Sequence, residues 1–269
     1  MVKIRITPLY STQFFSLFLL RMRVIKGIFS LLWRFWFLLT YAVPFVLLMP
    51  ITIFFTLSQK LYPLLYWFLH RLAWFMLYAS GIFPKIRKEG KLDSNKQYIF
   101  CSNHPSTLDI VLMFALSKKP ISFIGKASLG KIPVFGYYYK SFNVLVDRSN
   151  LRNSYVAYQE AGEKLKEGQN MVIYPEGGIP KEDIRLFRFK NGPFRLAVEE
   201  QLSIIPITFA DNKRLFPMDY LCGKPGIARI TIHEEVSAKG MNEKNIEELK
   251  NKVFNIIESE LIRYENESR

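Results

Sequence analysis

Acidic residues are missing from the first third of this 269-residue chain, and cysteine is scarce throughout. Eleven Lys and Arg residues precede Glu89 with no Asp or Glu among them, whereas the rest of the chain holds 26 basic and 23 acidic residues. The two cysteines, Cys101 and Cys222, are too few for a disulfide scaffold and lack metal-ligand spacing, which fits a reduced, intracellular setting. With 49% hydrophobic and 15% aromatic residues, the chain is also too apolar to be disordered.

The basic first third has the composition of a membrane segment. Its bases flank runs of Phe, Leu and Trp, which favours contact with anionic lipid and argues against a nucleic-acid partner. Residues 35–57 carry no charge and, at about 1.5 Å per residue, are long enough to cross a hydrocarbon core of about 30 Å. Pro44 and Pro50 interrupt this run, so a bent hairpin in one leaflet fits equally well. Residues 14–33 and 61–78 are typical of interfacial helices, and a cleaved signal peptide is disfavoured by the length of the run.

The remainder of the chain is typical of an α/β domain. Gly81 and Pro84 mark a change to balanced charge and short apolar runs, so we expect a membrane-anchoring helical segment over residues 1–82 and a folded domain over residues 83–269. Expected strands and helices alternate, which predicts a central, mostly parallel or mixed sheet flanked by helices. The strands are expected at 98–101, 121–124, 144–146, 171–174, 204–209 and 227–232, and the helices at 106–116, 152–165, 194–200 and from 245 onward.

The segment from Asn103 to Asp109 follows one expected strand and opens an expected helix. Ser106 and Asp109 form a capping pattern, which places Asp109 in the first helical turn and His104 in the loop before it. A carboxylate that accepts from one imidazole nitrogen fixes the tautomer, and the other nitrogen can then take a proton from a hydroxyl. A surface histidine beside a simple helix cap is the alternative reading.

The spacing of His104 and Asp109 resembles the first motif of the glycerolipid acyltransferases, the family of 1-acyl-sn-glycerol-3-phosphate acyltransferase. Further similarities follow in the family's order over residues 83–235. Residues 124–136 with 144–148 resemble the second motif, residues 174–177 the third and residues 205–207 the fourth, and residues 189–194 resemble the Phe-Lys-x-Gly stretch between the last two.

This resemblance implies a membrane-bound enzyme, expected at the cytoplasmic face of the cell membrane. It would move a fatty acyl group from acyl-CoA or acyl carrier protein to the free hydroxyl of a lysophospholipid, with 1-acyl-sn-glycerol-3-phosphate as the expected acceptor and phosphatidic acid as the product. The thioester is a co-substrate, and no cofactor or metal is expected. The resemblance assigns His104 as the general base and Asp109 as its orienter, with substrate-binding roles for four further residues: Lys126, Arg148, Glu176 and Gly177. Lysine and arginine at such positions can neutralise a phosphate, the arginine through a bidentate fork.

One departure from the family pattern concerns the acceptor. The third motif commonly continues with Thr-Arg, whereas this chain has Gly178 and Ile179, so a phosphate-binding arginine is missing. Arg185, Arg188 or Lys190 could replace it from the following loop. A lyso-aminolipid acceptor and a non-catalytic, lipid-binding membrane scaffold are the two alternatives.

Three other features suggest chemistry that the sequence does not support. Residues 125–131 spell the beginning of a phosphate-binding loop, but Ile132 stands where Ser or Thr must hold magnesium. Cys101 lies inside an expected strand and is expected to be a buried apolar residue rather than a nucleophile. His70 and His233 have no metal-ligand spacing.

Overall fold

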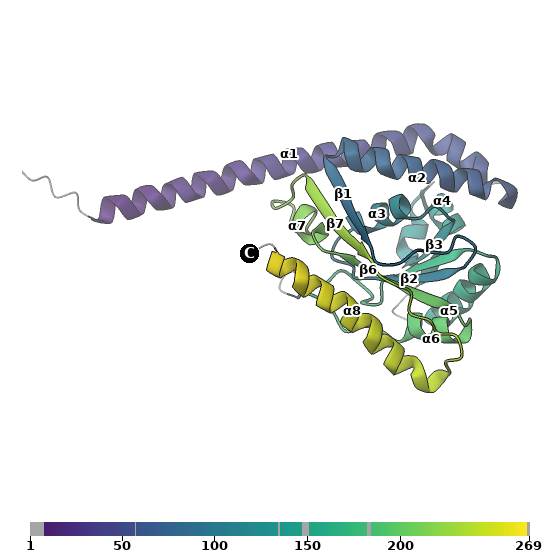
Figure 1. The fold of residues 1–269 in the computed structure, drawn as a ribbon. Coiled ribbons are helices and arrows are strands. Elements are labelled where there is room, and N and C mark those ends of the chain that lie inside the picture. The colour runs from purple at the N-terminus through teal and green to yellow at the C-terminus, as the bar shows by residue number, and fades with distance from the viewer. Residues whose placement is uncertain (1–7, 57, 134, 147–150, 182–183, 268–269) are drawn as a thin grey trace, which may run out of the picture.

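The computed structural model describes residues 8–56, 58–133, 135–146, 151–181 and 184–267. The chain begins with a long helix, α1 (Pro8–Thr56), followed by a short 3-10 turn (Gln59–Leu61) and α2 (Tyr62–Ala79). The two helices lie side by side along one side of the molecule (Figure 1). After them the chain enters a seven-stranded sheet.

The sheet is mixed, with strands in the order β1-β7-β6-β2-β5-β3-β4. Its strands are β1 (Ile82–Lys88), β2 (Tyr98–Ser102), β3 (Ile121–Lys126), β4 (Val144–Val146), β5 (Asn170–Ile173), β6 (Ser203–Phe209) and β7 (Gly226–Ile232). Every neighbouring pair is parallel except β6 with β7. The expected mostly parallel or mixed sheet is therefore confirmed, and all six expected strands are present.

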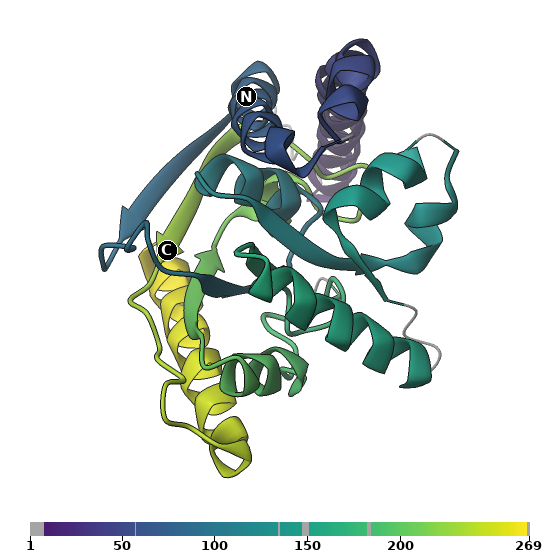
Figure 2. The ribbon, with the colours of Figure 1, turned by 90° about the vertical axis from the view of Figure 1, so that its right-hand side faces the viewer.

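Helices cover both faces of the sheet (Figures 1 and 2). One face packs α2 and α3 (Leu108–Leu116), and the other packs α5 (Leu151–Lys166), α6 (Gly192–Glu199) and α8 (Ile246–Glu267). Each face has its own hydrophobic core, built around Leu112 and Ile205 on the first face and around Phe194 and Val253 on the second. Smaller elements connect the strands: a 3-10 turn (Ala127–Lys131), α4 (Phe135–Phe142) and α7 (Asn212–Leu215). A further 3-10 turn (Glu243–Asn245) precedes α8.

Helix α1 joins the expected interfacial stretch, residues 14–33, to the charge-free run that follows it. It is continuous and contains both Pro44 and Pro50. Arg34 lies between the two stretches, and its side chain is buried, 8% exposed, against a loop of the folded domain. Its Nη2 donates to the carbonyl oxygens of Pro217 at 2.5 Å and Asp219 at 2.7 Å, so backbone groups of the folded domain solvate part of the guanidinium.

The two halves of α1 have different surroundings. The first part of α1 projects beyond the sheet domain (Figure 1), and the apolar side chains of residues 15–29 are mostly exposed. By contrast, Trp33 and Phe37 share the hydrophobic core of the first face with Leu65 and Leu77 of α2. Residues 15–56 form one helix long and apolar enough to cross a membrane. A division of the chain at residue 82 stays a prediction, since these helices and the sheet bury their side chains in a common core.

Candidate active site

The candidate site lies at the edge of the sheet where four parallel strands end. His104 follows β2, residues 174–177 follow β5, α7 follows β6, and Lys126 is the last residue of β3. Because the carboxyl ends of parallel strands meet at one edge, segments far apart in sequence converge there. The rest of the site is built around the loop between β2 and α3.

His104 and Asp109 form a hydrogen-bonded pair in this loop. His104 Nδ1 donates to Asp109 Oδ2 at 2.9 Å, and the backbone N–H of Ser106 donates to the same oxygen at 3.1 Å. The Asp109 side chain is fully buried, whereas that of His104 is 14% exposed. A donating Nδ1 leaves Nε2 as the basic nitrogen of a neutral imidazole, which is the arrangement that a general base requires.

The surroundings of Asp109 act on its pKa in opposite directions. Burial raises the pKa of its carboxyl, and the hydrogen bonds from His104, Asn212 and Ser106 oppose that rise. Asn212 supplies its bond from α7: Nδ2 donates to Asp109 Oδ1 at 2.6 Å. The carboxylate is therefore held on both oxygens.

Tyr174 holds the other side of the imidazole. Its ring stacks on that of His104 with centroids 3.9 Å apart and an interplanar angle of 14°. Burial raises the pKa of the Tyr174 phenol well above its usual value, so the ring meets His104 as a neutral aromatic surface. This contact restricts the imidazole to an orientation facing Asp109.

Glu176, for which the sequence predicts a contact with substrate, is hydrogen-bonded within the protein. Its side chain is buried, 6% exposed, and both carboxylate oxygens accept backbone N–H groups. Oε1 accepts from His104 at 2.7 Å and Oε2 accepts from Phe187 at 2.8 Å. Burial raises the pKa of this carboxyl, and the two amide donors oppose the rise. Glu176 thus ties the His104 loop to the segment that follows β5, and its predicted contact with substrate stays a prediction.

Gly177 turns the chain directly after Glu176. Its φ of +77° is in the left-handed region, which favours glycine. An added Cβ would lie 2.7 Å from Lys190 Nζ, so the glycine also makes room for the lysine. Lys190 therefore lies over the turn of the third motif, where the family's arginine is missing.

The other predicted cations are distributed unevenly. Lys126 is exposed at the end of β3, on the edge of the sheet that carries His104. Arg148 lies outside the residues that the structure describes. Arg185 is directed away from the site, because its guanidinium forms a two-bond pair with Glu265 of α8 at 2.8 Å. Of the three candidates for the missing arginine, Arg188 is exposed, and Lys190 is the one placed against Gly177.

Cys101 and His233, to which the sequence assigns no catalytic or metal-binding role, are buried and contact other protein groups. Cys101 is fully buried in β2, and burial raises the pKa of its thiol, as expected for an apolar core position. His233 bonds Thr208 through Nε2 and Glu89 through Nδ1. Across the described residues, no group of three His, Cys, Asp or Glu side chains is arranged like metal ligands.

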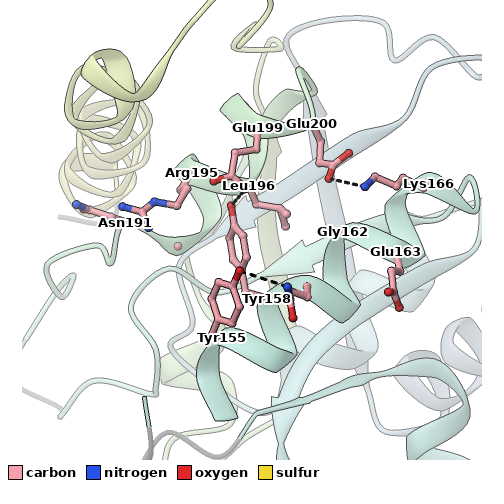
Figure 3. Close-up of a pocket in the computed structure, with 12 residues that line it drawn as sticks. Tyr155, Tyr158, Gly162, Glu163, Lys166, Asn191, Arg195, Leu196, Glu199 and Glu200 are labelled. Carbon is pink, nitrogen blue, oxygen red and sulfur yellow. Dashed lines mark hydrogen bonds and ion pairs between the residues drawn. The ribbon is translucent and has the colours of Figure 1, made fainter. Parts of the chain in front are cut away.

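Figure 3 shows a cavity of about 720 Å³ elsewhere in the molecule, between α5 and α6. Its lining includes Tyr158, whose hydroxyl donates to Glu199 at 2.5 Å, and Lys166, which pairs with Glu200 at 3.8 Å. None of the site residues described above lines this cavity. The candidate active site is therefore the open edge around His104.

Comparison with known proteins agrees with the site. Residues 84–210 match the family model "Acyltransferase". This range contains the His104–Asp109 dyad and the third motif, residues 174–177. The resemblance of this chain to the glycerolipid acyltransferases is therefore confirmed.

Individual relatives narrow this class. The chloroplastic 1-acyl-sn-glycerol-3-phosphate acyltransferase of Arabidopsis thaliana is 31% identical over 60% of this chain and 47% of its own length. The enzyme of the same name from Helicobacter pylori is 30% identical over 49% of this chain and 55% of its own length. The chain thus spans about half the length of these relatives. The crystal structure of the 1-acyl-sn-glycerophosphate acyltransferase from Thermotoga maritima superposes with a TM-score of 0.75, covering 90% of this chain and 98% of the other at 22% identity, which shows a shared fold.

Two features of the site were missed by the sequence reasoning. Tyr174 belongs to the third motif, but the sequence does not indicate its stacking on His104, because that contact depends on where β5 ends. Asn212 lies just beyond the matched region, in a four-residue helix that no periodic pattern indicates. Only the three-dimensional arrangement brings these two side chains to the dyad.

Proposed function

We propose that the protein is a membrane-bound 1-acyl-sn-glycerol-3-phosphate acyltransferase, with acyl-CoA or acyl carrier protein as the donor. The observation that carries the proposal is the buried carboxylate of Asp109 bonded to Nδ1 of a partly exposed His104. The relatives' names give the acceptor, and acylation of its free hydroxyl would give phosphatidic acid, which would place the protein in phospholipid biosynthesis.

In the proposed reaction His104 Nε2 takes the proton of the acceptor hydroxyl while the hydroxyl oxygen attacks the thioester carbonyl carbon. The tetrahedral intermediate collapses with cleavage of the C–S bond, and the imidazolium returns its proton to the leaving thiolate. Asp109 keeps the imidazole in the correct tautomer and stabilises the imidazolium. No acyl-enzyme is formed, so no protein nucleophile is required.

The test of this mechanism compares His104→Ala and Asp109→Asn with Cys101→Ala as a control. General-base catalysis contributes roughly 10²–10⁴ in rate, so both dyad variants should lose at least a hundredfold in kcat. Purified protein in detergent would be assayed for release of the donor thiol, with folding checked by circular dichroism. Retention of more than about a tenth of the activity by folded His104→Ala, or loss of activity in Cys101→Ala, contradicts the mechanism.

For the acceptor, we propose that its phosphate binds Lys126, Arg148 and Lys190, with Lys190 replacing the missing arginine. Support comes from the place of Lys190 over Gly177 and from the engagement of Arg185 with Glu265. Hydrogen bonds to charged groups contribute about 1.5–3 kcal/mol, so losing one cation should raise the KM about tenfold or more.

The matched variants for this proposal are Lys190→Ala and Arg185→Ala, assayed with 1-acyl-sn-glycerol-3-phosphate and with a phosphate-free lyso-aminolipid. Lys190→Ala and Arg148→Ala should raise the KM of the phosphate acceptor alone, and Arg185→Ala should change neither. Equal losses with both acceptors, or activity only with the aminolipid, would promote the lyso-aminolipid alternative. Absence of transfer to every acceptor would favour the non-catalytic scaffold.

We also propose that α1 anchors the protein at the cytoplasmic face of the cell membrane, with α2 at the interface. Support comes from the exposed apolar side chains of residues 15–29, interspersed with Arg21, Arg23 and Lys26, which suit anionic lipid. Apolar burial is insensitive to salt, so detergent but not a high-salt wash should release the full-length chain. Recovery in the soluble fraction after the salt wash would contradict anchoring by α1.

A further inference from the structure

Among the described residues, Asn212 is the one side chain from outside the dyad loop that forms a hydrogen bond with the Asp109 carboxylate. It begins α7, between β6 and β7, and is fully buried. Its Nδ2 donates to Asp109 Oδ1 at 2.6 Å, whereas His104 and Ser106 both donate to Oδ2. Asn212 thus bonds one carboxylate oxygen of Asp109, Oδ1, while the other oxygen, Oδ2, faces the imidazole of His104.

The rest of the Asn212 amide has no such partner. Its Oδ1 is buried and finds no hydrogen bond within the described part of the chain. Turning the amide over would place this oxygen against the Asp109 carboxylate, which is repulsive as long as Asp109 is ionised. An unpaired buried carbonyl is costly, and such groups in folded proteins call for an explanation. Here the donor to Asp109 is maintained even though the second polar atom of the same side chain is left unpaired.

Helix α7 is fixed in place on both sides of Asn212. Before it, Asp211 accepts from the backbone N–H of Arg229 at 3.0 Å and from its Nε at 2.7 Å, which ties α7 to β7. After it, the carbonyl oxygen of Phe216 accepts from Ser106 Oγ at 2.6 Å, which ties α7 to the dyad loop. A helix held in this way can place one amide against a carboxylate with little freedom.

We propose that Asn212 is a positioning residue of the acyl transfer, whose amide N–H keeps Asp109 ionised and oriented toward His104. This inference rests on the proposed function. The titratable groups facing Asp109 are His104 of its own loop, together with Tyr174 and Glu176 from the segment after β5. Asp211, next to Asn212, is paired with Arg229. Loss of the amide donor destabilises the ionised carboxylate, so the His104–Asp109 pair holds its proton more tightly.

The test uses Asn212→Leu, which keeps a similar shape and removes the donor, with Arg214→Ala as a control on the same helix. Arg214 is exposed and pairs with Asp211 rather than with Asp109. In Asn212→Leu kcat should fall about tenfold with a small change in KM, and the acid limb of the pH–rate profile should move up by about one pH unit. Arg214→Ala should leave the profile in place.

A second readout does not depend on activity. The chain holds three histidines, so the titration of His104 can be followed by NMR of histidine-labelled protein in detergent micelles. The apparent pKa of the dyad should rise in Asn212→Leu even if the protein proves inactive toward every acceptor, which separates this inference from the proposed function. If Asn212→Leu folds and the apparent pKa of the dyad stays at its wild-type value, the positioning role is overturned. A lower melting temperature as the only change would overturn it as well.

Discussion

Replacement of Glu176 by Gln distinguishes two roles of this residue: support of the His104 loop and binding of substrate. The wild-type carboxylate accepts two buried backbone N–H groups, from His104 at 2.7 Å and from Phe187 at 2.8 Å. Glutamine has one acceptor oxygen and one NH₂ group, so one of these two amides must face another donor. Hydrogen bonds to charged groups contribute about 1.5–3 kcal/mol, and relief from burying a charge offsets part of this loss. We expect Glu176→Gln to lower the free energy of unfolding by about 2 kcal/mol.

The kinetic effect should fall on kcat. A displaced His104 backbone moves the imidazole relative to Asp109, and small misplacements of a catalytic group are costly, so we expect a loss of about ten- to a hundredfold. The KM for the acceptor should change little. For a domain of this size, about 2 kcal/mol corresponds to a fall of roughly 4–8 °C in the melting temperature.

The assay is steady-state thiol release from the donor at varied acceptor concentration, together with thermal unfolding followed by circular dichroism. Glu199→Gln is the control, because Glu199 is an exposed residue of α6 that accepts from the Tyr158 hydroxyl, away from the dyad. It should leave kcat unchanged and alter stability by less than about 1 kcal/mol. The reasoning is refuted if Glu176→Gln raises the acceptor KM while kcat and the melting temperature stay at wild-type values.

Three further predictions concern a ring, an arginine and a carboxylate. Tyr174→Leu should lower kcat several-fold by removing the stack on His104, whereas Tyr174→Phe should keep both kcat and the melting temperature, because the Tyr174 hydroxyl is buried without a partner among the described residues. Arg34→Ala should lower the melting temperature in detergent, since two hydrogen bonds and a contact 4.5 Å above the Phe216 ring are lost. Burial alone would raise the pKa of Glu260, but hydrogen bonds from Arg263, Thr231 and Arg87 lower it to about 2. Its stabilisation is therefore complete above the ordinary value of 4.5 and is lost as the pH falls toward 2, and melting temperatures between pH 5 and 3 should fall less steeply in Glu260→Gln.

The dyad was predictable from sequence because its geometry is local. Five positions separate His104 from Asp109, and a capping pattern fixes the start of α3 between them. Glu176 and Asn212 reach the same site across sequence separations of 72 and 103 residues. Their partners are set by the order of the strands, which no local spacing encodes.

The sheet was predicted where its strands are buried and apolar. Strand β1 was missed because it lies at the edge, where exposed Lys and Arg alternate with apolar residues and Pro84 is tolerated. The burial of Arg34 was likewise not predictable from a local pattern. A charge in an apolar run indicates a boundary only if it reaches water, and Arg34 instead finds the carbonyl groups of Pro217 and Asp219.

The segment that follows α7 links the proposed membrane helix α1 to the Asp109 carboxylate through a series of three contacts. The Phe37 ring of α1 lies 4.4 Å from the Phe216 ring, the Phe216 carbonyl accepts from Ser106 Oγ at 2.6 Å, and the Ser106 N–H donates to Asp109 at 3.1 Å. If the bilayer holds α1, this series of contacts holds the dyad at a constant depth beside it. A lysophospholipid keeps its acyl chain in the membrane, so its hydroxyl can reach His104 only if that depth matches the headgroup region. Under the proposed function, packing of α1 against Phe216 would therefore position the dyad as well as attach the protein.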